Sequence, residues 1–103
     1  MKVLVLGRDP SVVDSSVTII GQNGFEAVGV TSDQDAFAQL DTGEFQAVVV
    51  GGGVSPQSRP LIKQHAAPHG TEVLESRRTL GQSIEGHVIK VIVPRLRELS
   101  AQA

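Results

Sequence analysis

The chain has 103 residues, of which 40% are hydrophobic and 19% are charged, and its formal net charge is -2. This length and composition predict one globular domain over residues 1–103, because a disordered chain would have fewer apolar residues and a larger net charge. The small negative charge argues against nucleic acid as a partner, and the absence of cysteine excludes disulfides and thiolate chemistry.

The first segments after the amino terminus are a strand and a helix. Residues 3–6 form an unbroken apolar run that stops at Gly7, which is typical of a strand buried on both faces. Asp9 is then placed to cap a helix with Pro10 at its first position, and this helix is expected to end between residues 21 and 24. No apolar stretch has the length of a membrane span or the pattern of a signal peptide, so we expect a cytoplasmic protein with no membrane partner.

A strand, a helix and a second strand follow. Residues 25–30 and 45–50 are strand-like, and the second run has the strongest buried-strand signal in the chain. Between them, Ser32 and Asp35 have the spacing of a capping box at the start of a helix. We expect that helix to end at Gly43 and to bury Ala36, Phe37 and Leu40.

The pattern is weaker after the glycine run that ends the third strand. We expect a long loop and then a helix from about Pro60, because a helix begun at Pro56 would place the ring of Pro60 where it is harmful. This helix is expected to stop at Pro68, and residues 71–75 supply a fourth strand. Its predicted core face consists of Leu61, Ile62 and His65.

The last segment has two interpretations. Apolar residues recur at intervals of three or four, which predicts one long amphipathic helix kinked near Pro94. The alternative is a fifth strand over residues 88–93, which are mostly β-branched, followed by a short helix. The residues that carry the helical spacing are Leu80, Ile84, Val88, Ile92, Leu96 and Leu99.

The order of these elements predicts an α/β fold. Strands that alternate with helices through short connections form a parallel sheet with helices on both faces. Right-handed crossovers make 2-1-3-4 the economical strand order. We therefore expect a three-layer sandwich around a parallel sheet of four strands, or five if residues 88–93 are extended.

The first half of the chain resembles the receiver domain of two-component response regulators, which has a flavodoxin-like fold. The resemblance extends to about residue 56 and is specific for architecture more than for activity. The chain as a whole resembles a truncated receiver that leaves out the region between its fourth helix and fifth strand. The matching segments are residues 2–6, 9–11, 22–28, 35–40 and 45–50.

The resemblance also implies that phosphotransfer is lost. In receivers, the aspartate that ends the third strand is phosphorylated. The reaction uses Mg²⁺, which is held by that carboxylate and by an acidic pair after the first strand. Here the acceptor position matches Gly51, and the acidic pair matches Gly7 and Arg8, or Arg8 and Asp9 with a register shifted by one. Because divalent ions need clustered oxygen ligands, a guanidinium opposes binding. The receiver hydroxyl after the fourth strand matches Ser76, and the receiver lysine has no counterpart.

Two interpretations of the glycine run remain open. Ligands of parallel α/β sheets bind at the carboxyl ends of strands where the strand order reverses, which here lies between the first and third strands. Backbone amides, a hydroxyl and the donors of Arg8 are suited to a small anion. The simpler interpretation is that the glycines only permit a tight or left-handed turn. The candidate anion-binding residues are Gly7, Arg8, Asp9, Gly51, Gly52, Gly53 and Ser55.

The histidines and arginines favour structural roles. His65 and His69 have the spacing of metal ligands, but the helix is expected to end between them, which leaves His65 in the core and His69 in a surface loop. His87 has no nucleophile motif beside it, so we expect no catalytic residues, metal or cofactor. The local basic clusters, Arg77-Arg78 and Arg95-Leu96-Arg97, indicate solvated faces or ion pairs.

The last segment carries more apolar residues than a four-stranded sheet needs. Such a stripe is suited to a homodimer interface, although a helix that simply packs on the sheet is the plainer interpretation. The candidate interface residues are Ile84, Val88, Val91, Ile92 and Leu99. The sequence thus predicts a non-catalytic, receiver-like regulatory or protein-interaction module, with a domain that binds a small anion or nucleotide as the alternative.

Overall fold

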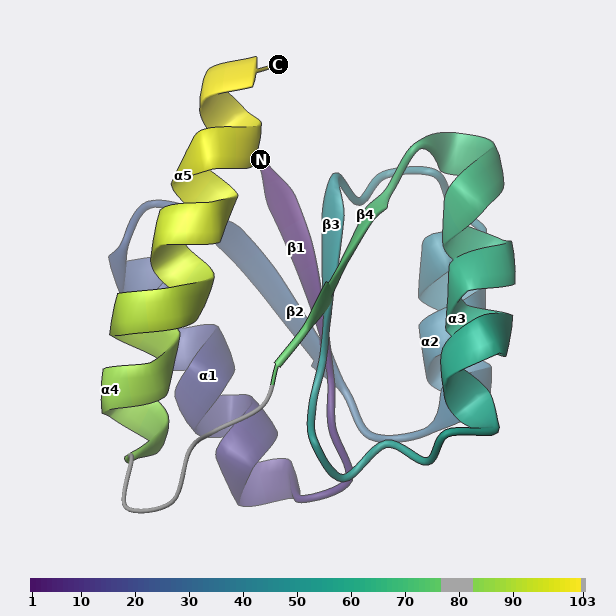
Figure 1. Ribbon diagram of the computed structural model, residues 1–103, viewed down its shortest axis with the longest axis horizontal. Helices are drawn as coiled ribbons and strands as arrows, with labels where there is room; N and C mark the ends of the chain where they lie inside the picture. The colour runs from purple at the N-terminus through teal and green to yellow at the C-terminus, as the bar shows by residue number, and fades with distance from the viewer. Residues whose placement is uncertain (77–82, 103) are drawn as a thin grey trace.

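A computed structural model describes residues 1–76 and 83–102 (Figure 1). Its four strands, β1 (Lys2–Leu6), β2 (Glu26–Val30), β3 (Ala47–Val50) and β4 (Glu72–Glu75), form one parallel sheet in the order β2-β1-β3-β4. The predicted strand order is confirmed. β1 and β3 are the central strands, which explains why their sequences are almost entirely apolar.

Helices cover both faces of the sheet, so the predicted three-layer sandwich is also confirmed. In Figure 1, α1 (Pro10–Gln22) and the C-terminal helix lie to the left of the sheet, and α2 (Asp33–Leu40) and α3 (Ser58–Ala66) lie to the right. A short 3-10 turn, η1 (Ala67–His69), follows α3. The C-terminal helix consists of α4 (Ile84–His87), a π-helical turn η2 (Val88–Ile92) and α5 (Val93–Gln102).

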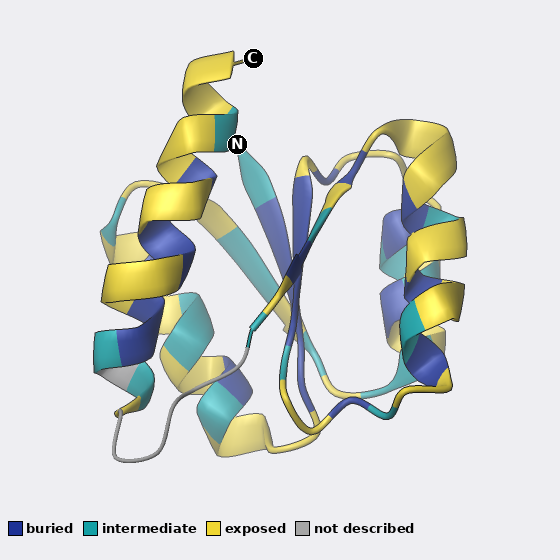
Figure 2. Ribbon diagram, in the orientation of Figure 1, coloured by how far each residue is buried: buried dark blue, intermediate teal, exposed yellow. Residues whose placement is uncertain are grey.

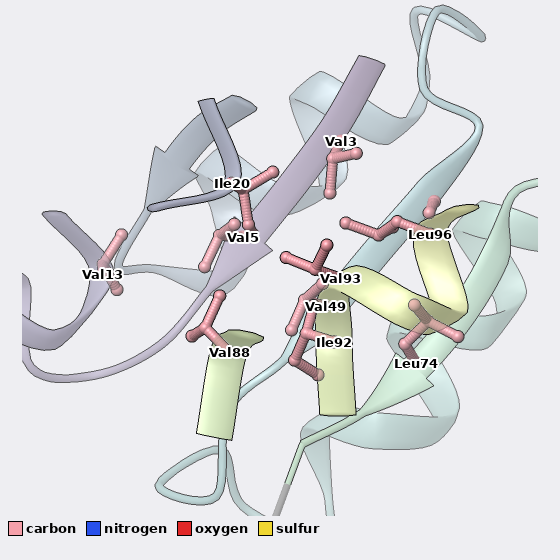
Figure 3. Packing of buried hydrophobic residues seen from close by; sticks show 11 residues of the cluster. Val3, Val5, Val13, Ile20, Val49, Leu74, Val88, Ile92, Val93 and Leu96 are labelled. Atoms are coloured by element: carbon pink, nitrogen blue, oxygen red, sulfur yellow. The ribbon is translucent and has the colours of Figure 1, made fainter. Parts of the chain in front are cut away.

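The core is divided by the sheet into two clusters. Alternate residues of β1 point to opposite faces, so that Val3 and Val5 join one cluster while Leu4 and Leu6 join the other. Figure 2 shows the buried residues on the central strands and on the inner faces of the helices. Figure 3 shows the cluster that α1 and the C-terminal helix form with β1, β3 and β4.

The caps of the first two helices are as predicted. The Asp9 carboxylate accepts a hydrogen bond from the Ser11 amide at 3.0 Å, and Pro10 is the first residue of α1. The Ser32 hydroxyl accepts one from the Asp35 amide at 3.1 Å at the start of α2. Both side chains satisfy amides that have no partner within the helix.

The start and face of α3 correct the sequence analysis. The helix begins at Ser58, so Pro60 lies in its first turn, where a missing amide hydrogen costs no helical bond. Ser58, Ile62 and Ala66 then form the buried face at a spacing of four residues. Leu61, which we expected in the core, is 43% exposed because it lies one residue off that face.

The C-terminal segment is a helix, and the alternative fifth strand is not formed over residues 88–93. Its irregularity is a π turn in which the Val93 amide donates to the carbonyl of Val88, five residues back. This turn immediately precedes Pro94, whose ring would collide with the carbonyl four residues earlier in a regular α-helix. The expected kink therefore takes the form of a wider turn, and Leu80 lies outside the described residues. None of the helices in the described ranges could span a bilayer.

Candidate functional site

A cavity of about 430 Å³ opens at the carboxyl ends of β1, β3 and β4, on the face that α1 and the C-terminal helix cover. Its inner wall is apolar and comes from the sheet and both helices. Its mouth is polar and contains Gly7, Arg8, Asp9, residues 51–53, Ser76 and His87. This is the place where the sequence predicted a ligand site, because the strand order reverses between β1 and β3.

The backbone at Gly51 packs closely against the end of β1. Its amide donates to the carbonyl of Leu6 at 2.8 Å, and a Cβ at this position would lie 3.2 Å from that carbonyl oxygen. Residues 51–54 form a tight turn closed by a hydrogen bond of 3.2 Å from the Val54 amide to Gly51. The positive-φ glycines of the described chain are Gly24, Gly43 and Gly70, so of the two turns that the sequence left open, residues 51–54 form the tight one.

The backbone at Gly7, which lies next to Gly51, is also tightly packed. A Cβ at Gly7 would lie 2.9 Å from Cγ2 of Val13, a core residue of α1. The methyl groups of Val13 also fill the space beside Gly29, where a Cβ would lie 2.5 Å away. Glycine at position 7 therefore serves the packing of α1 against the ends of β1 and β2.

Arg8 does not point its donors at the glycine run. Its guanidinium donates to the Thr31 carbonyl at 3.0 Å, to Asp33 Oδ1 at 2.6 Å and to Ser58 Oγ at 3.4 Å. The Ser58 hydroxyl in turn donates to Asp33 Oδ2 at 2.5 Å. Hydrogen bonds from Ser58 and Arg8 together lower the pKa of the Asp33 carboxyl. The donors named as candidates for anion binding therefore join the ends of β1 and β2 to α3.

Ser55, another predicted anion ligand, is used in the start of α3. Its hydroxyl lies 3.1 Å from the hydroxyl of Ser58 and accepts the Ser58 amide at 3.3 Å. It thereby satisfies an amide of the first helical turn, as a capping side chain does. Of the predicted anion-binding set, the structure brings Gly7, Arg8, Asp9 and residues 51–53 to one mouth and leaves Ser55 outside the cavity lining.

The site contains a pair that sequence analysis missed. The Ser76 hydroxyl, directly after β4, lies 2.6 Å from Nε2 of His87 in α4, and both residues line the cavity. His87 is 3% exposed. The two residues are 11 positions apart on either side of residues 77–82, so no helical or strand spacing could have joined them. Only the position of Ser76 at the end of the predicted fourth strand gave a partial signal.

The remaining histidines and arginines make local contacts. His65, which we expected in the core, is half-buried, stacks on Phe37 with ring centroids 4.3 Å apart, and pairs with Asp41 at 2.7 Å. His69 is exposed in η1, as expected. Across the described residues there is no cluster of three or more potential metal ligands. Arg95 pairs with Glu98, Arg97 donates to Asn23, and Arg77 and Arg78 lie outside the described residues.

Fewer of the candidate interface residues are exposed than the sequence suggests. Val88 and Ile92 are buried in the core, where they pack between the sheet and α1, so they are not available to a partner. Ile84 and Leu99 are partly buried against the same cluster. Val91 is 43% exposed, and it is the member of the predicted stripe that remains on the surface.

Comparison with solved structures places this arrangement among known folds. The receiver domain of the hybrid histidine kinase CckA superposes with a TM-score of 0.66 and covers 96% of this chain and 98% of that one, at 12% sequence identity. The chain has the fold of a receiver domain. The flavodoxin-like fold predicted from the first half of the sequence is therefore confirmed over the 96% of the chain that the comparison covers. No protein-family model matches the sequence, and no curated protein matches it either.

Proposed function

We propose that this receiver-like domain is a non-catalytic regulatory module that acts by binding a protein partner and is not phosphorylated on aspartate. The observation that supports this most directly is the end of β3. The residue there is Gly51, whose backbone is hydrogen bonded to the end of β1. A receiver uses a carboxylate at this position, and a fold without it has no acceptor.

The groups around Gly51 do not fit the Mg²⁺ that receivers employ. Gly7 has no side chain, and the next residue is the cation Arg8. The nearest carboxylate of the predicted pair, Asp9, caps α1 by accepting from the amide and hydroxyl of Ser11. Because Mg²⁺ requires clustered oxygen ligands, this donor set disfavours it, and no step of the proposed function passes through a metal.

The alternative function, binding of a small anion or nucleotide at the glycine run, is less well supported. Its main cation, Arg8, is already paired with Asp33, and the Ser55 hydroxyl already accepts from the Ser58 amide at the start of α3. An incoming anion would have to displace an ion pair of 2.6 Å to gain the same guanidinium. We therefore favour a protein-interaction role.

Incubation with acetyl phosphate and Mg²⁺ tests the proposal. We expect intact-mass analysis to show no added phosphoryl group on the full chain, while an active receiver domain treated in parallel gains one. A matched variant that carries both Arg8→Asp and Gly51→Asp tests whether these two positions account for the absence of phosphorylation. A stable phosphorylated form of the unmodified chain would refute the proposed function.

A further inference from the structure

The cavity beside the glycine run has an apolar interior. Six buried aliphatic side chains line it, two from the sheet, two from α1 and two from the π turn. Figure 3 labels these side chains among the buried residues of the cluster on this face of the sheet. A volume of about 430 Å³ lies in the range of small-molecule sites, toward the lower end. The aliphatic residues are Val5, Val13, Ile20, Val49, Val88 and Ile92.

The mouth offers one well-defined polar anchor. Ser76 Oγ and His87 Nε2 share a hydrogen bond of 2.6 Å, and both side chains line the cavity. When the hydroxyl donates to the imidazole, its oxygen still accepts from a ligand. When the imidazole donates, the hydroxyl still donates to a ligand. A ligand hydroxyl can satisfy either arrangement, and a ligand carbonyl can satisfy the second.

The charges at the mouth favour an uncharged ligand. Among the described residues that line the cavity, the charged ones are Arg8 and Asp9. The Arg8 guanidinium donates to the Thr31 carbonyl and to the Asp33 carboxylate, so its charge is already paired. A buried anion without a cation to pair with carries a large desolvation cost.

The π turn that accommodates Pro94 also forms part of the cavity wall. Single π turns within helices occur often at functional sites, because they displace side chains from regular helical positions. Here the turn carries Val88 and Ile92, which line the cavity, and directly follows His87. The irregular segment of the helix and the polar anchor therefore belong to the same wall.

We propose that this cavity binds a neutral, mainly apolar small molecule of one or two rings, with a single hydroxyl or carbonyl group hydrogen bonded to the Ser76–His87 pair. This inference goes beyond the proposed function, because it gives the domain a small-molecule input. It does not depend on the absence of phosphorylation. The two proposals are tested by different measurements and fail separately.

Three probes that share one ring system test the chemistry of the ligand. The neutral 2-naphthol, the apolar 2-methylnaphthalene and the anionic 2-naphthoate are titrated into the ¹⁵N-labelled full chain and followed by amide NMR shifts. We expect saturable binding of 2-naphthol, with the largest shifts at the mouth, in residues 51–53, Ser76 and His87. We expect 2-naphthoate to bind at least about tenfold more weakly, because the cation of the described lining, Arg8, is already paired with Asp33.

Two substitutions locate the site. Ser76→Ala removes the hydroxyl, and it should weaken 2-naphthol about tenfold while leaving 2-methylnaphthalene unchanged, because only the first probe uses that group. Ser16→Leu adds an aliphatic group at a half-buried position that lines the cavity, and it should weaken both neutral probes. Ser15→Leu is the matched control, since Ser15 is exposed and lies outside the lining.

Several results would overturn the inference. These are the absence of saturable 2-naphthol binding at millimolar concentration, shifts confined to another surface, unchanged affinity in Ser16→Leu, or tighter binding of 2-naphthoate that is lost in Arg8→Ala. The last result would instead support an anion site. If a variant fails to fold by amide-shift dispersion, the shift map of the unmodified chain decides the question alone.

Discussion

The Asp33 side chain connects three segments at the carboxyl edge of the sheet by hydrogen bonds. Its carboxylate receives Arg8 from the end of β1 and Ser58 from the start of α3. The side chains of Asp33 and Arg8 are 30% and 36% exposed, so water screens part of their attraction. We infer a modest stabilisation of about 1 kcal/mol or less from the ion pair.

The lowered pKa of Asp33 gives this contribution a defined pH dependence. Because the pKa of the carboxyl is below its ordinary value of 3.8, the stabilisation is present above that value and is lost as the pH falls through the folded-state pKa. Asp33→Asn should lower the melting temperature at neutral pH, and the difference from the unmodified chain should shrink below about pH 4.

Thermal unfolding of both proteins between neutral and acidic pH measures this effect. Asp35→Asn is the matched control, because Asp35 is exposed in the same first turn of α2 and lies outside the Arg8–Ser58 contacts. It removes the same favourable charge from the helix amino terminus. A pH-independent difference between Asp33→Asn and the unmodified chain would contradict the interpretation.

Individual site residues were the hardest part to predict from sequence. Gly51 was correctly placed at the end of β3, since a long apolar run stops there. The direction of Arg8 was not predictable, because its partner Asp33 belongs to the capping region of another helix. The Ser76–His87 pair joins residues on either side of a connection, and periodicity within an element carries no information on such contacts.

At the level of elements, the C-terminal helix divides its apolar residues between the core and the surface. In the π turn, Ile92 is 3% exposed and Ile89 is 45% exposed. Ile92→Ala should lower the free energy of unfolding by about 2–4 kcal/mol, because it leaves a space in the core. Ile89→Ala removes the same atoms in the same turn and should change it by about 0.5 kcal/mol or less.

Chemical denaturation of the two variants provides the comparison. Equal destabilisation would mean that the π turn does not place Ile92 and Ile89 on opposite sides of the helix. A large effect of Ile89→Ala alone would show that this surface position is covered, as it would be in a dimer. The concentration dependence of the denaturation midpoint separates that case from a monomer.

Elements with a single dominant signal were predicted well. β1 and β3 are buried on both faces, so their apolar runs left one interpretation, and the first two helices have capping side chains beside them. The C-terminal helix was ambiguous because residues 88–93 are suited both to a strand and to a helix face. What decided between them was packing against α1, which is a tertiary contact.

At the scale of the whole molecule, the C-terminal helix completes one of the two core clusters. Val88, Ile92, Val93 and Leu96 are four of the eleven buried residues of the cluster on that face. A chain that ends at residue 82 should therefore lose its cooperative thermal transition, because the inner face of the sheet would be exposed to water. A chain shortened only by residues 100–103 should melt as the full chain does.

Circular dichroism melting curves distinguish these truncations. A sharp transition in the shorter chain would show that residues 1–82 fold independently and that the expectation of one domain over the full length is wrong. Loss of the transition in both truncations would instead point to a role for the last residues, although residues 100–102 are exposed.

The close packing at Gly7 restricts the order in which mutations could introduce an acidic pair into this fold. An aspartate there would bring its Cβ to 2.9 Å from a methyl group of Val13, a β-branched residue that is 3% exposed. Repacking of Val13 would have to come first, and that change alone loses core contacts without gaining a carboxylate. Each of the two changes taken alone is therefore expected to be destabilising, and the packing at Gly7 disfavours an acidic residue there.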